Sequence, residues 1–82
     1  MRYREKPVVV EAFRWEDGES LPGWLCNAVA LGRVEVVGGR LRIRTLEGEM
    51  EAAPGDWVIR GVKGELYPCK HDVFTATYEE AE

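Results

Sequence analysis

The sequence has few cysteines, a single histidine and no long apolar run near its start. Cys26 and Cys69 are its only cysteines and form no CxxC motif, so two reduced thiols in a cytoplasmic protein is the simplest interpretation, with one disulfide as the alternative. A zinc site needs four converging ligands, and these residues supply too few. The apolar run Val8–Val10 is too short for a signal peptide or a membrane span. We therefore expect no metal, no cofactor and no membrane segment.

The composition is that of one small globular domain spanning residues 1–82. The chain has 45% hydrophobic and 32% charged residues, which is typical of a folded domain and not of a disordered one. A single core of this size is only just sufficient, so oligomerisation or ligand binding is expected to add stability. The net charge of −4 argues against bulk binding of duplex nucleic acid, which needs a strongly basic field.

The first third of the chain predicts one strand and one helix. Residues 3–15 alternate in a way that predicts a strand, with Val8, Val10 and Ala12 on one face. A helix is predicted from Ser20 to about residue 31, with Ser20 as N-cap and a glycine, residue 32, as its stop.

The middle of the chain predicts a three-strand meander. A turn at residues 38–39 pairs Val34 with Ile43 and Glu35 with Arg42. A second predicted turn at Glu47-Gly48 pairs residue 45 with 50, 44 with 51 and 43 with 52. In this register the apolar residues share one face, the charged residues share the other, and two opposite-charge pairs form.

A further hairpin follows Pro54-Gly55, which favours a turn. Its predicted reversal at Val62-Lys63 pairs Arg60 with Glu65, residue 59 with 66 and residue 58 with 67. Residues 70–73 are expected to form one helical turn or a loop. Residues 74–78 are expected to form a last strand, with Phe74, Ala76 and Tyr78 inward.

The predicted fold class is α+β. One helix and six or seven short strands are expected, with a small antiparallel sheet that curls into an open barrel or half-barrel and packs against the helix.

Three stretches resemble a family of small, largely uncharacterised phage and prophage proteins. These are residues 11–15 (EAFRW), residues 54–70 (PGDWVIRGVKGELYPCK) and the ending from Phe74 through residues 77–79 (TYE). His71 stands where that pattern usually has a proline. The resemblance spans nearly the whole chain and implies a phage-encoded protein made in the cytoplasm of a bacterial host. It implies no particular activity.

The candidate ligand site lies in the last hairpin. Glycines let backbone N–H groups approach an anion, arginine and lysine neutralise phosphate, and aromatic rings stack on bases. A structural interpretation, in which the glycines only make the turn and the tryptophan only fills the core, is favoured over this one because no Walker or Rossmann spacing accompanies it. The candidate residues are Trp57, Arg60, Gly61, Lys63, Gly64 and Tyr67.

Other polar groups are given structural interpretations. The stripe Arg40, Arg42 and Arg44 alternates with glutamates and is interpreted as a salt-bridged solvent face. The cluster Arg2, Arg4 and Lys6 is interpreted as solubilising.

Catalytic interpretations of the remaining polar residues have little support. Cys69 and His71 could form an activated thiolate, but no third member or oxyanion hole is evident. Asp56 is interpreted as an acceptor for backbone N–H groups of its turn.

Two hypotheses of function follow. The first is a non-enzymatic binding protein, expected to be a homo-oligomer, that sequesters a small anionic ligand such as a nucleotide signal of host defence. The second is a structural or protein-interaction module that binds a phage or host protein through a sheet edge or an aromatic patch. A small enzyme is the least favoured alternative.

Overall fold

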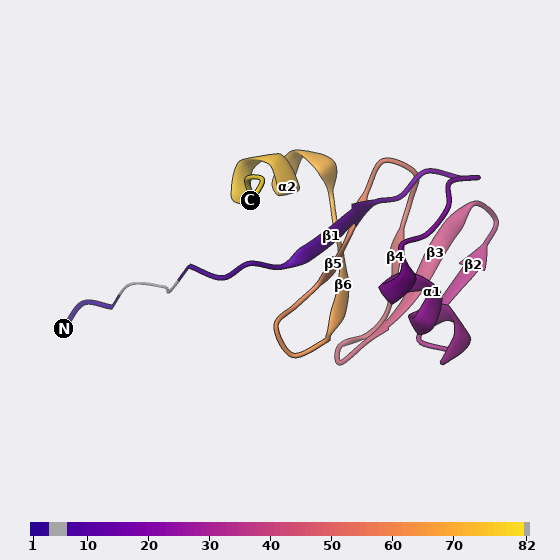
Figure 1. The fold of residues 1–82 in the computed structure, drawn as a ribbon, viewed down its shortest axis with the longest axis horizontal. Helices are drawn as coiled ribbons and strands as arrows, with labels where there is room; N and C mark the ends of the chain where they lie inside the picture. Colours follow the sequence, from indigo (N-terminus) through magenta and orange to yellow (C-terminus); the bar gives the residue numbers. More distant parts are fainter. Residues whose placement is uncertain (4–6, 82) are drawn as a thin grey trace.

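A computed structural model describes residues 1–3 and 7–81 (Figure 1). Within these residues the chain forms six strands and two helices. In chain order they are β1 (Glu11–Arg14), α1 (Gly23–Ala30), β2 (Val34–Val37), β3 (Arg40–Thr45), β4 (Gly48–Ala52), β5 (Trp57–Arg60), β6 (Leu66–Cys69) and α2 (His71–Thr77).

The strands form two antiparallel three-stranded sheets and not the single curled sheet expected from the sequence. One sheet has the order β1-β5-β6 and the other β2-β3-β4. The mainly β character with one early helix is confirmed. The half-barrel is wrong, since β5 pairs with β1 and β6 while β4 ends its sheet without a neighbour on that side.

The main core lies where the two sheets and α1 meet. The apolar face predicted for the meander is confirmed in part. Leu41 and Ile43 are fully buried, whereas Val36 and Met50 on the same predicted face are 48% and 40% exposed. Helix α1 contributes Leu25 and Ala28, and β5 contributes Val58. The cluster as a whole comprises Trp15, Leu25, Ala28, Val34, Leu41, Ile43, Ala52, Val58 and Leu66.

Strand β1 is much shorter than the strand predicted over residues 3–15. It pairs only where β5 is available, from Glu11 opposite Arg60 to Arg14 opposite Trp57. Beyond Arg60 the chain turns away, so Pro7–Val10 has no partner strand in the described part of the chain. Residues 4–6 of the predicted strand, and with them Arg4 and Lys6 of the basic cluster, lie outside the described residues, as does residue 82.

Helix α1 starts later than predicted. Pro22, with φ −64° and ψ 157°, occupies the N-cap position in place of Ser20, and the helix ends before Gly32 as expected. Leu25 and Ala28 form the buried face, whereas Leu31 is exposed.

The strand pairing of the first hairpin is confirmed, and the strand pairing of the second is shifted by two residues. Val34 lies opposite Ile43 and Glu35 opposite Arg42, as predicted. The second reversal falls at residues 46–47, so residue 43 faces residue 50 and residue 44 faces residue 49.

The Thr45 side chain explains this displacement. Its hydroxyl accepts a hydrogen bond from Glu47 N at 3.1 Å and donates one to Gly48 O at 2.6 Å. Gly48, with φ 108°, follows the turn and does not stand within it. A shift of two residues keeps each side chain on its predicted face, which is why the apolar face survives the error.

The pairing of β5 with β6 is shifted by one residue from the predicted pairing. Gly61 N donates to Glu65 O at 2.8 Å, which leaves a loop of residues 62–64. Gly64 takes φ 81°, the left-handed conformation that a three-residue loop needs at its end. Arg60 therefore faces Leu66 and not Glu65, and residue 59 faces Tyr67.

The predicted last strand is wrong, because residues 71–77 form helix α2. The spacing of Phe74 and Tyr78 fits one face of a strand, but it is also the i, i+4 spacing of neighbours on a helix. Their rings stack with centroids 5.0 Å apart. Ala76, expected to face inward, is exposed.

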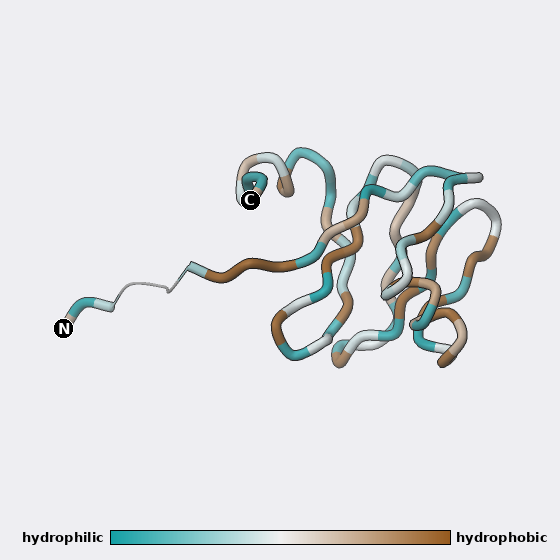
Figure 2. The backbone as a smooth tube through the Cα atoms, in the orientation of Figure 1, coloured by the Kyte–Doolittle hydropathy of each residue, from teal (hydrophilic) through white to brown (hydrophobic). Residues whose placement is uncertain are grey.

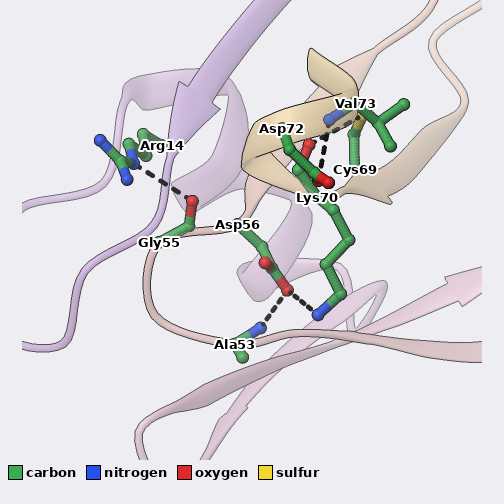
Figure 3. A network of polar contacts seen from close by, with 8 residues as sticks. All are labelled: Arg14, Ala53, Gly55, Asp56, Cys69, Lys70, Asp72 and Val73. Carbon is green, nitrogen blue, oxygen red and sulfur yellow. Dashed lines mark hydrogen bonds and ion pairs between the residues drawn. The ribbon is translucent and has the colours of Figure 1, made fainter. Parts of the chain in front are cut away.

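The turn before β5 is fixed by Asp56, as predicted. Asp56 is 7% exposed, and its Oδ2 accepts a hydrogen bond from Ala53 N at 2.9 Å and pairs with Lys70 Nζ at 2.9 Å (Figure 3). The same turn is joined to β1, since Arg14 Nε donates to Gly55 O at 3.1 Å. The carboxylate thus links the turn to the residue that leads into α2.

We expect Asp56→Ala to lower the free energy of unfolding by about 2 kcal/mol, because it leaves the Ala53 N–H without its charged acceptor. Lys70→Met is the control. The Lys70 side chain is 69% exposed, so its loss should cost only about 0.5 kcal/mol. Urea unfolding followed by tryptophan fluorescence measures both, and equal losses would contradict this account.

Candidate functional site

The structure divides the predicted site residues among three places. Alternation along β5 directs Trp57 to the side of the sheet that carries α2, and Arg60 to the side that carries the main core. Tyr67 is on the α2 side, with its hydroxyl 3.4 Å from that of Tyr78. Gly61, Lys63 and Gly64 are at the hairpin loop. The six residues therefore do not form one cluster.

The loop itself uses its N–H groups internally. Gly64 N donates to Gly61 O at 3.0 Å, and Lys63 N donates to Glu65 Oε2 at 3.0 Å. The Glu65 side chain covers Gly61 so closely that a Cβ there would overlap its carboxylate. With the Gly61 amide also bonded to Glu65 O, the N–H groups of both glycines, which were expected to face an anion, have acceptors within the loop.

Arg60 lines a cleft between α1 and the β5–β6 hairpin. The cleft has a volume of about 620 Å³, and Arg33 reaches it from the segment that follows α1. Helix α1 contributes Trp24 and Asn27 to its wall, and Leu66 contributes an apolar surface. Two guanidinium groups, an aromatic ring and a side-chain amide thus border one concave surface.

Each arginine of the cleft is held by one contact. Arg33 Nη2 donates to Gly64 O at 2.7 Å, and this bond fixes the hairpin loop against the end of α1. Arg60 Nη1 lies 3.0 Å from Glu11 Oε1, in place of the predicted pair with Glu65. A guanidinium has five N–H donors, so both groups keep donors beyond these contacts.

Sequence reasoning missed Trp24, Asn27 and Arg33. Nothing in the spacing of residues 24–33 connects them with the hairpin. The one available signal was Arg33, a cation placed directly after the helix stop.

A second concave surface lies beneath α2. Trp57 stacks on Phe74 with ring centroids 3.8 Å apart and an interplanar angle of 9°. The open groove beside this pair has a volume of about 850 Å³ and is bordered by Pro7–Val10 and by residues 77–81. Three valines and the rings of Trp57 and Phe74 are part of its lining.

The contacts around Cys69 and His71 give no support to an activated thiolate. His71 Nδ1 accepts a hydrogen bond from Trp57 Nε1 at 3.1 Å, and the Cys69 thiol faces Lys70 O at 3.6 Å. Burial raises the pKa of the Cys69 thiol, and the carboxylates of Asp72 and Asp56 raise it further. The thiol is thus protonated at neutral pH, whereas a nucleophilic cysteine needs a lowered pKa.

The arginine stripe on β3 belongs to a charged solvent face. Arg42 Nε lies 3.8 Å from Glu49 Oε2, and Arg40 and Arg44 are exposed. Among the described residues, no three histidine, cysteine or acidic side chains gather as metal ligands. In the same part of the chain, neither helix has the length and apolarity needed to cross a membrane.

The chain was compared with models of protein families, with curated proteins and with solved structures, and no match was found in any of the three.

Tyr67 provides a pH-dependent test of the packing beneath α2. Burial, followed by the hydrogen bond with Tyr78, raises the pKa of Tyr67 to about 12 from 10.0. Folding favours the protonated phenol, so this stabilisation is complete below pH 10 and is lost as the pH rises towards 12. We expect the free energy of unfolding to fall across this window, and to fall less in Tyr67→Phe. Chemical denaturation at several pH values measures both, and parallel curves would contradict the assignment.

Proposed function

We propose that this protein is a non-enzymatic binding module that captures a small anionic ligand in the cleft between α1 and the β5–β6 hairpin. The observation that carries the proposal is that Arg33 and Arg60 border the same cleft as Trp24. Arginine donates paired hydrogen bonds to phosphate or carboxylate, and the indole ring offers a stacking surface. This combination suits a nucleotide-type ligand, with an anionic group and a planar ring.

The charge balance of the cleft limits which ligands it suits. Glu11 pairs with Arg60 and neutralises part of its charge, so a ligand anion has to compete with this carboxylate. The Arg60 side chain is 44% exposed, and an ion pair of this kind is weak. A ligand with one or two negative charges is therefore favoured over a polyanion, in keeping with the acidic net charge.

The biological setting rests on the resemblance to phage proteins. A phage protein of this kind, made in the cytoplasm of its bacterial host, would act by sequestering a nucleotide signal of host defence. It would bind this ligand without chemical conversion.

A thermal-shift and calorimetric screen against cyclic and linear mononucleotides and inorganic phosphate tests this function. A ligand present at about 100 times its Kd raises the unfolding temperature of a domain this small by roughly 10 °C or more. The absence of a response from every compound would overturn the proposal.

Substitutions locate the binding site. We expect Arg60→Gln to weaken binding at least about tenfold, through the loss of a charge-assisted contact. Arg40→Gln is the matched control, because Arg40 is exposed on β3 and does not border the cleft. Equal effects of the two substitutions would place the ligand elsewhere.

The second candidate function, a protein-interaction module, is favoured by a different observation. Val8 and Val9 are 57% and 76% exposed in a segment that continues the edge strand β1. Exposed apolar residues beside a strand edge are typical of a docking surface.

A further inference from the structure

The segment Pro7–Val10 leaves the body of the protein as an apolar arm (Figure 1). Figure 2 shows its hydrophobic stretch running up to β1. In the described part of the chain, the arm makes no backbone hydrogen bond outside its own segment. It continues β1, which is the edge of its sheet. The arm and β1 together therefore offer an unpaired strand edge.

The hydrogen-bonding pattern of β1 shows which groups this edge presents. Trp15 N donates to Asp56 O at 2.8 Å, and Trp15 O accepts from Gly55 N at 2.7 Å. In an antiparallel pair, alternate residues direct their N–H and C=O groups to the same neighbour. Residues 11, 13 and 15 therefore face β5, and residues 12 and 14 face outwards. If the arm continues this alternation, residues 8 and 10 also face outwards. Pro7 is odd-numbered like the residues that face β5, so the N–H group that it lacks is not one of the outward-facing donors.

The residues that usually protect an edge are missing from this arm. Natural sheets block their edges with charged side chains, bulges or a proline in the ladder. Pro7 is out of phase, and Val8, Val9 and Val10 carry no charge. Strand addition to this edge would remove exposed valine surface from water and satisfy the outward backbone groups together.

We propose that the occupant of this edge is the same edge of a second copy, paired antiparallel about a twofold axis at Val9. Outward groups belong to even-numbered residues, so only registers that pair even with even residues form hydrogen bonds. An axis at Glu11 would place two carboxylates opposite each other, which is unfavourable. An axis at Val10 would place Val9 opposite the partner's Glu11. An axis at Val9 places Val8 opposite the partner's Val10 and Val9 opposite its own copy, so the three valines of the two arms match and Glu11 lies opposite the partner's Pro7.

In the resulting dimer, residues 7–11 of the two copies form a two-stranded ribbon that joins the two β1-β5-β6 sheets, and β1 does not lie beside the partner's β1. Because the twofold axis is perpendicular to this ribbon, both α2 helices lie on the same side of it. The inference gives the second candidate function a specific partner and does not depend on the ligand cleft.

Sedimentation equilibrium of the full chain over a concentration series, without ligand, tests the dimer. We expect the wild type to be dimeric, and Val9→Lys to raise the dimer dissociation constant at least about tenfold by placing two charges at the axis. Leu46→Lys is the control, because Leu46 is an exposed apolar residue of a different turn and should leave the dimer intact. Val9→Lys should keep the wild-type unfolding temperature of the monomer, since Val9 is exposed there.

Disulfide trapping tests the register. Val9→Cys should cross-link the dimer, because opposite residues of a non-hydrogen-bonded pair have Cα atoms about 4.5 Å apart. Val8→Cys should not cross-link, since its two copies are offset along the strands. Peptide mapping distinguishes this bond from one formed by Cys26, which is exposed.

Three results would overturn the proposal. The first is a wild type that stays monomeric at every concentration, which would leave the edge to a partner of different sequence. The second is a dimer that survives Val9→Lys. The third is equal cross-linking through Val8→Cys and Val9→Cys.

Discussion

The structure depends on the burial of both faces of β5. Val58 and Ile59 are adjacent in the chain and both 0% exposed, although their side chains lie on opposite faces of the sheet. Val58 belongs to the core shared with the second sheet and α1. Ile59 faces the side where Trp57 contacts Phe74. A strand buried on both faces needs a layer on each, and this need explains why the chain has a second helix.

The sequence predicts the parts of this fold that depend on local pattern. Alternation in residues 34–43 determines both the register and the buried face, because a slip of one residue would expose Leu41 and Ile43. The remaining hairpins were misjudged where a single contact changes the loop length. The Thr45 hydroxyl selects one turn and the left-handed Gly64 lengthens another, and neither effect has a periodic signal. Residues 74–78 satisfy both a strand and a helix pattern, and only packing against Trp57 decides between them.

The candidate site could be predicted only in part for a related reason. Arg60 is on β5 and was identified from its hairpin. Its neighbours in the cleft come from α1 and from Arg33, whose bond to Gly64 O spans 31 residues of sequence. Contacts at this separation depend on how the two sheets pack, and a sequence pattern carries no information on that packing. Gly61 and Gly64 belong to the hairpin loop, as the structural interpretation predicted, and Arg60 next to them borders the cleft.

The aromatic stack beneath α2 divides the molecule into two units of unequal stability. Helix α2 has no buried residue of its own and is held mainly by Phe74 against Trp57 and by the contact between the Tyr67 and Tyr78 hydroxyls. The main core lies on the other side of β5 and shares none of these contacts. The amides of α2 should thus exchange with solvent deuterium through local opening, long before those of β3, which open only when the whole domain unfolds.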